Sequence, residues 1–168
     1  IEGLTEFLPI SSTGHLILAS HILGIPQTDF VKSFEIAIQL GSILAVVVIF
    51  WKSFLNKEIL KRLLVAFIPT GAIGFLLYPF IKEYLIGNTI VVVTALIIGG
   101  FVIIAIEHFH KERAEVERPV EHLSYTHAFG VGCAQALAVI PGVSRSGASV
   151  MGGLLLRIPR TTLLTFSF

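Results

Sequence analysis

Three long stretches of the chain carry no charged residue and are mostly apolar. They cover residues 36–51, 63–81 and 84–106. A helix needs about 20 consecutive apolar residues to cross the hydrocarbon core of a bilayer. The third stretch is too long and too uniformly apolar to be typical of a soluble core helix. The pattern therefore predicts an all-α integral membrane protein with three transmembrane helices.

Two further uncharged stretches, residues 7–28 and 122–144, are interrupted by polar residues, glycine and proline. The interruptions fall at residues 9–15 and 141–147. Each stretch is expected to form a helix, a broken loop and a second helix. Irregular backbone at membrane depth persists only where protein or a water-filled cavity pairs its N–H and C=O groups. The two polar breaks are therefore candidate functional sites.

The cations between the apolar stretches predict an orientation. Four follow the first stretch, one follows the second and three follow the third: Lys52, Lys57, Lys61 and Arg62; Lys82; and Lys111, Arg113 and Arg118. Because Lys and Arg are enriched in cytoplasmic loops, residues 51–62 and 107–121 are expected in the cytoplasm and residues 82–88 outside. The chain begins at Ile1 without a recognisable signal peptide, so we expect the natural N-terminus to be missing.

The two broken stretches resemble each other at an offset of 133 residues. Identical pairs are Ser11 and Ser144, Gly14 and Gly147, Leu23 and Leu156, Ile25 and Ile158, Pro26 and Pro159, and Thr28 and Thr161. Chance similarity is the alternative. An odd number of spans separates the copies, so a true repeat would be inverted in the membrane. We expect one membrane domain over residues 1–168, with repeat copies over about 1–62 and, incompletely, about 134–168.

The charge balance excludes a nucleic-acid partner. Lys and Arg total 12 and Asp and Glu total 11, which gives a formal net charge of +1. A nucleic-acid-binding surface needs a clear excess of positive charge. Charged residues make up only 14% of the chain and apolar residues 54%, in agreement with a protein of the bilayer.

Two carboxylates stand just before the first polar break. Glu2 and Glu6 are four residues apart, so on a helix they share one face. In an apolar setting their repulsion must be offset, either by a divalent cation with hard oxygen ligands or by a proton held at a raised pKa. The alternative is that both side chains simply face the external water.

The second polar break holds an isolated cation. Arg145 is flanked by Ser144 and Ser146, and it is the only charged residue between Glu121 and Arg157. A guanidinium offers a planar set of donors that matches phosphate, and small neighbours let backbone N–H groups approach the same anion. The alternative is an ion pair between Arg145 and one of the glutamates with nothing bound. Together the two breaks contain the groups that phosphoryl transfer from a lipid would need.

The two motifs resemble those of a known family. Glu2-x-x-x-Glu6 followed by PISSTGH, together with PGVSRSGAS, is similar to the signature motifs of bacterial undecaprenyl pyrophosphate phosphatases, also called the bacitracin-resistance family. The similarity continues through FEIAIQLGSILAVVVIFW and covers essentially the whole chain. The resemblance implies a multi-pass enzyme of the bacterial inner membrane that removes the terminal phosphate of the C55 isoprenoid pyrophosphate. Such an enzyme would recycle the carrier lipid for peptidoglycan synthesis and confer resistance to bacitracin.

The resemblance also implies an arrangement and a set of roles. It implies inverted repeats with re-entrant helix pairs, a site open to the outer side, and Mg²⁺ or Ca²⁺ as cofactor; a homodimer is left open. Glu6, with Glu2, would bind the metal or act as base, and Ser12 is the preferred nucleophile, with His15 as proton shuttle or rival nucleophile. Arg145 would hold the pyrophosphate. The expected substrate-binding residues are Ser11, Thr13, Gly142, Ser144 and Ser146.

Two departures from the family pattern are visible. Ser149 stands where the family commonly has Thr, which preserves the hydroxyl. Family members are also longer, and the offset of 133 places residues 165–168 opposite residues 32–35, just before the first apolar stretch. The span of the second copy is thus expected to be missing. The competing function is a transporter or flippase of a lipid phosphate or small anion, since such proteins also use inverted repeats with broken helices.

Overall fold

The computed structural model describes residues 1–26, 28–86, 88–110 and 119–167, and the described residues form helices and no strand. Three long helices dominate: α3 (Asp29–Phe54), α4 (Lys57–Phe80) and α5 (Thr89–Phe109). A π-helical turn, Ile81–Leu85, extends α4. The first predicted stretch lies in α3, the second in α4 with its extension, and most of the third in α5, which begins at residue 89. All three helices are long and apolar enough to cross a membrane. The all-α architecture with three candidate spans is confirmed.

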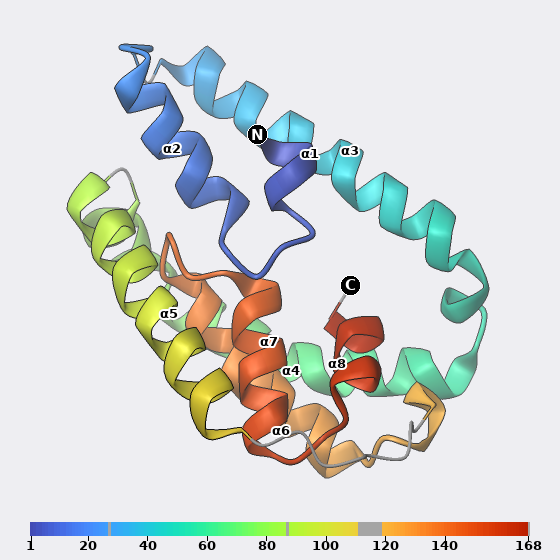
Figure 1. Cartoon of the computed structure of the whole chain (residues 1–168). Helices are drawn as coiled ribbons and strands as arrows, with labels where there is room; N and C mark the ends of the chain where they lie inside the picture. The colour runs from blue at the N-terminus through green and yellow to red at the C-terminus, as the bar shows by residue number, and fades with distance from the viewer. Residues whose placement is uncertain (27, 87, 111–118, 168) are drawn as a thin grey trace.

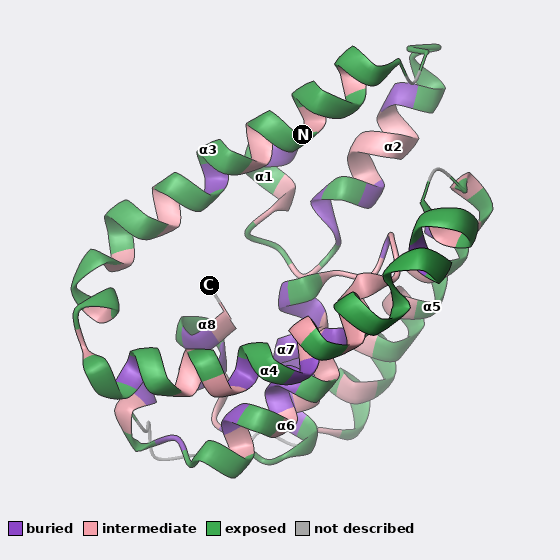
Figure 2. Cartoon of the chain, turned by 180° about the vertical axis from the view of Figure 1, so that it is seen from behind, coloured by how far each residue is buried: buried purple, intermediate pink, exposed green. Residues whose placement is uncertain are grey.

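The long helices bury little of their apolar surface inside the protein. In the most apolar part of α3 and of α5 only 6% of the residues are buried, and in α4 only 11%. Figure 2 shows the exposed residues along most of α3 and α5. Apolar side chains that face outward on all sides are typical of helices surrounded by lipid. Asn56 and Asn88 cap the starts of α4 and α5 by accepting hydrogen bonds from backbone N–H groups.

A short helix, α1 (Glu2–Thr5), precedes the first broken stretch, which itself contains one helix, α2 (Ser12–Ile22). The break lies at residues 6–11, earlier than expected, and residues 12–15 form the first turn of α2 instead of a loop. The physical reason is the cap: the Ser11 hydroxyl accepts a hydrogen bond from the Gly14 N–H at 3.3 Å, which starts the helix at Ser12.

The second broken stretch is built in the same way. Helix α6 (Tyr125–Gln135) continues into a 3-10 turn, Ala136–Val139, and after a loop the chain enters α7 (Arg145–Leu155) and α8 (Arg160–Ser167). A short 3-10 turn, Val120–His122, precedes α6. Ser144 caps α7 by accepting from the Gly147 N–H at 3.0 Å. Arg145 therefore lies in the first turn of a helix.

The two stretches share local geometry at the offset of 133. Ser11 and Ser144 are both N-caps, and α2 and α7 are both 11 residues long. The helix ends match as well. Ile25 N–H donates to Ser20 O at 2.9 Å and Ile158 N–H to Gly153 O at 3.1 Å, each across a residue of positive φ. That residue is Gly24 in the first stretch and Arg157 in the second.

The buried core lies mostly in the second half of the chain and includes part of α4: α6 packs against α4 and α7, and α7 against α8 (Figure 1). Its buried residues are Ile59, Ala66, Val120, Leu123, Ala128, Val131, Val150, Met151, Leu154, Ile158, Leu163 and Phe166. Glycine allows the closest approach: a Cβ on Gly132 of α6 would lie 2.1 Å from the Ala66 carbonyl oxygen of α4. The cations Lys111, Arg113 and Arg118, which the orientation uses, lie outside the described residues.

Candidate active site

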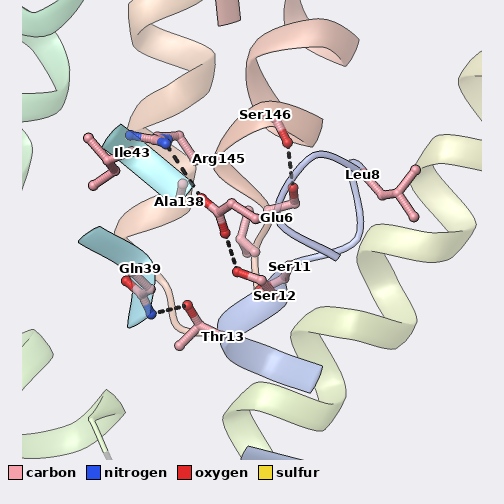
Figure 3. A pocket seen from close by; sticks show the side chains of 12 residues that line it. Glu6, Leu8, Ser11, Ser12, Thr13, Gln39, Ile43, Ala138, Arg145 and Ser146 are labelled. Atoms are coloured by element: carbon pink, nitrogen blue, oxygen red, sulfur yellow. Dashed lines mark hydrogen bonds and ion pairs between the residues drawn. The ribbon is translucent and has the colours of Figure 1, made fainter. Parts of the chain in front are cut away.

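The two polar breaks meet at one cavity of about 220 Å³ (Figure 3). In Figure 1 the turn between α1 and α2 lies beside the start of α7, near the middle of the molecule. Helix α3 supplies a further part of the lining. The lining residues are Glu6, Leu8, Ser11, Ser12, Thr13, Gln39, Ile43, Ala138, Val143, Ser144, Arg145 and Ser146.

Two helix N-termini border this cavity. Ser11 is the N-cap of α2, and the next two residues also line the cavity. Ser144 is the N-cap of α7, and Arg145 and Ser146 line the cavity after it. The first N–H groups of a helix have no partner within the helix, and the helix dipole favours negative charge there. Two such ends at one cavity are suited to an anion with several oxygen atoms.

Glu6 connects the two motifs. The Ser12 hydroxyl donates a hydrogen bond to Glu6 Oε2, and Glu6 Oε1 lies 3.8 Å from Arg145 Nη2. Figure 3 shows both contacts. The contact with Arg145 also agrees with the simple ion pair that the sequence left open. However, the Arg145 side chain is 59% exposed, which leaves the guanidinium open to a ligand in the cavity.

Backbone strain is present where the first motif enters α2. Ser11 has a φ of 62°, which residues other than glycine rarely adopt. The equivalent Ser144 has a φ of −69° and no such strain. Strained backbone like that at Ser11 is concentrated at functional sites.

The Ser144 and Ser146 hydroxyl oxygens lie 3.2 Å apart, so the second motif places two hydroxyls side by side at the cavity.

Glu2 is buried next to the cavity and does not line it. Only 6% of the residue is exposed, so the alternative in which both carboxylates face external water fails for Glu2. Neither carboxylate oxygen has a hydrogen-bond partner among the described residues. Burial raises the pKa of Glu2, and the nearby charge of Glu6 raises it further. A proton or a cation would offset the burial of this carboxylate.

The donor set fits a hard divalent cation. Glu2 and Glu6 are one helical turn apart, and the described residues contain no cluster of three or more Asp, Glu, His or Cys. Mg²⁺ is commonly held by one or two carboxylates together with water and the phosphates of a substrate. Two carboxylates beside hydroxyl oxygens match that pattern.

Besides Glu2, two residues that the sequence assigned to the site lie outside the cavity lining. His15 is half-buried, and its Nδ1 is 2.9 Å from the Ser11 carbonyl oxygen. A carbonyl only accepts, so Nδ1 carries the proton and Nε2 of the neutral ring is the basic atom. Gly142 has a φ of 95°, and a Cβ there would lie 2.7 Å from the Val92 carbonyl oxygen of α5. Gly142 thus allows the loop to pack on α5.

Sequence reasoning missed Gln39. This half-buried residue of α3 lines the cavity, and its Nε2 donates to Thr13 Oγ1 at 3.2 Å. The available signal was a Gln inside an otherwise apolar predicted span, where a polar side chain is costly and marks a candidate site. Gln39 links the first membrane helix to the start of α2.

The whole chain is similar to known proteins. The family model "Bacitracin resistance protein BacA" matches residues 1–168. The undecaprenyl-diphosphatase of Aquifex aeolicus is 55% identical over 169 aligned residues, and that of Sulfurihydrogenibium sp. (strain YO3AOP1) is 53% identical over 168. The undecaprenyl-diphosphatase of Wolinella succinogenes is 53% identical over 169. All of the chain is covered, but it spans only 66%, 66% and 65% of these relatives' lengths, in the same order.

Proposed function

Because the chain belongs to the bacitracin resistance protein BacA family, we propose that the protein hydrolyses undecaprenyl pyrophosphate to undecaprenyl phosphate and inorganic phosphate. Relatives named undecaprenyl-diphosphatase support this substrate. The reaction recycles the lipid carrier of the cell wall and protects against bacitracin. The observation that carries the proposal is the Ser12–Glu6–Arg145 arrangement at one cavity.

Ser12 is the nucleophile in this proposal. Its oxygen forms a bond to the terminal phosphorus while the bond from that phosphorus to the bridging oxygen breaks. Glu6, which already accepts the Ser12 hydrogen bond, takes the proton and passes it to the departing lipid phosphate. Water then attacks the phosphoserine and gives a proton to Glu6, which returns it to the Ser12 oxygen as inorganic phosphate leaves.

Arg145 and the two helix starts hold the pyrophosphate. The guanidinium stabilises the negative charge that develops on the phosphate oxygens during transfer. Thr13, Ser144 and Ser146 add hydroxyl donors from the first turns of α2 and α7. Ser11 contributes through its cap, because it fixes where α2 begins. These groups act together since the cavity brings both motifs to one ligand.

Mg²⁺ or Ca²⁺ is the proposed cofactor, held by Glu2 and Glu6. The support is the buried, unpartnered carboxylate of Glu2 among the described residues. When bound, the ion would neutralise negative charge between the carboxylates and the pyrophosphate.

His15 is the rival nucleophile, and the geometry favours Ser12. The cavity is lined by Ser12 and not by His15. His15 is one helical turn further into α2, where its ring is oriented by the Ser11 carbonyl. We propose that its basic Nε2 exchanges protons with water that enters the site.

The proposed setting is the bacterial inner membrane, with two re-entrant helix pairs related as inverted repeats. The shared caps and helix ends at the offset of 133 support the repeat. Both motifs pack against the first part of α5: Gly14 faces Leu96, and Gly142 faces Val92. The positive-inside rule puts that end of α5 outside, so the cavity would open toward the outer side.

A transporter of a lipid phosphate or small anion is the competing function. A carrier would need the anion site at Arg145, but it has no use for a hydroxyl that donates to a carboxylate beside that site. The test is phosphate release from undecaprenyl pyrophosphate by the purified full-length protein in detergent, with Mg²⁺ or Ca²⁺ and then with EDTA. Metal-dependent release supports the proposal. If neither Mg²⁺ nor Ca²⁺ supports phosphate release, the proposal is rejected.

A further inference from the structure

A chain of hydrogen-bonded polar side chains links three helices beside the apolar core. Gln135, the last residue of α6, lies between helices α4 and α7. Its Nε2 donates to Thr70 Oγ1 of α4 at 3.3 Å, and its Oε1 accepts from Ser149 Oγ of α7 at 3.1 Å. Thr70 in turn donates to the Gly132 carbonyl oxygen of α6 at 3.1 Å. One amide thus joins three helices.

This chain of hydrogen bonds ends at the backbone carbonyl of Arg145. Ser149 is completely buried, and its hydroxyl lies 2.9 Å from the Arg145 carbonyl oxygen. A hydroxyl carries one proton, so Ser149 shares it between this carbonyl and Gln135. Gln135 and Arg145 also line one mostly apolar cavity of about 450 Å³, which Glu6 does not line. The first turn of α7 is therefore connected through Ser149 and Gln135 to the membrane helix α4.

Apolar packing alone could hold α7 in the core. Val150, Met151 and Leu154 are buried there, and polar groups in such a place are costly unless each finds a partner. A polar network with its partners in place fixes one arrangement more narrowly than apolar contacts do. The network lies between α4 and Arg145, the residue that faces Glu6. It can therefore hold Arg145 in one position.

We propose that Gln135 is a positioning residue for Arg145. It fixes the first turn of α7 so that the guanidinium faces Glu6 at the distance that catalysis requires. Gln135 does not line the cavity of Ser12 and Glu6, so it acts through Arg145 and not on the substrate. This inference rests on the proposed phosphatase function, and a misplacement of about 1 Å in such a site can cost 100-fold in rate.

A double-mutant cycle with Arg145 tests the inference. The substitution Gln135→Leu removes both hydrogen bonds and keeps similar bulk. We expect it to lower kcat for undecaprenyl pyrophosphate at least ten-fold in the unaltered background. In the Arg145→Ala background we expect less than a two-fold further change, because the group that Gln135 positions is already absent. Equal losses in both backgrounds, or no loss in either, would overturn the inference.

Ser149 provides a matched pair of variants. Thr and Val have nearly the same shape, and only Thr has the hydroxyl. We expect Ser149→Thr to retain kcat within about three-fold and Ser149→Val to lose it to the same extent as Gln135→Leu. A purely structural role predicts instead that both variants change thermal stability and leave kcat of the folded protein unchanged.

Hydrogen exchange gives a readout that does not depend on turnover. Faster amide exchange in residues 144–149 is expected for Gln135→Leu and Ser149→Val, but not for Ser149→Thr. If the unaltered protein releases no phosphate, the proposed function fails, and this measurement still decides whether Gln135 fixes the start of α7. Unchanged exchange in Gln135→Leu would contradict the inference.

Discussion

Glu6 faces Arg145 across the cavity, with its Oε1 3.8 Å from Arg145 Nη2, while its other oxygen accepts the hydrogen bond of Ser12. One carboxylate thus touches both the candidate nucleophile and the candidate anion-binding residue. The two motifs are far apart in the chain and meet because both pack on the same part of α5. Their joint chemistry depends on this contact.

Arg145 should not be replaceable by lysine without a large loss. A lysine preserves the positive charge but not the planar fork of donors that a phosphate group matches. We expect Arg145→Lys to lower kcat/KM about 10- to 100-fold, which corresponds to about 1.4–2.7 kcal/mol of lost transition-state stabilisation. Steady-state phosphate release checks this. Full activity of the lysine variant would show that only charge is needed.

Replacing Arg157 with glycine should stabilise the protein. Its φ of 59° lies in the left-handed region, where its equivalent at the offset of 133 is Gly24 with a φ of 65°. A side chain there costs about 1 kcal/mol relative to glycine. We expect Arg157→Gly to raise Tm by about 2–4 °C in detergent and Gly24→Ala to lower it by a similar amount. A decrease in Tm for Arg157→Gly would contradict this interpretation.

Gly132 should tolerate no side chain. A Cβ would lie 2.1 Å from the Ala66 carbonyl oxygen, so α4 and α6 would have to separate. We expect Gly132→Ala to destabilise the protein by about 1–3 kcal/mol, as overpacking of a close contact does. Gly99 of α5 is the matched control, since a Cβ there meets nothing within 4 Å. If thermal unfolding gives Gly132→Ala and Gly99→Ala the same Tm, the close approach of α4 and α6 at Gly132 is contradicted.

The sequence predicts the three long helices well because the length of an apolar run is a local property. It places the first break too late, since a polar run such as residues 12–15 resembles a loop until the Ser11 cap shows where α2 begins. Gln39 gives little local signal because one polar residue in a span does not show which cavity it reaches. The Glu6–Arg145 contact is tertiary: the offset of 133 relates the two motifs but does not show that they touch.

The burial of Glu2 is also a tertiary result. The spacing of Glu2 and Glu6 predicts a shared helix face, and the structure adds that Glu2 is almost completely enclosed. Composition could not show this, since the same two residues at the start of a chain are equally compatible with a solvated end. Among the described residues, neither carboxylate oxygen of Glu2 has a hydrogen-bond partner. This observation, and not the spacing of the two glutamates, supports the proposed cation.

The central claim is that Glu6, Ser12 and Arg145 form one catalytic unit. Its most direct test is kcat for phosphate release from undecaprenyl pyrophosphate by the full-length protein and by Glu6→Gln, Ser12→Ala and Arg145→Ala, with Tm measured for each. We predict that every variant loses at least about 100-fold in kcat while Tm stays within a few degrees of the unaltered protein. Full hydrolysis by all three variants would contradict the claim.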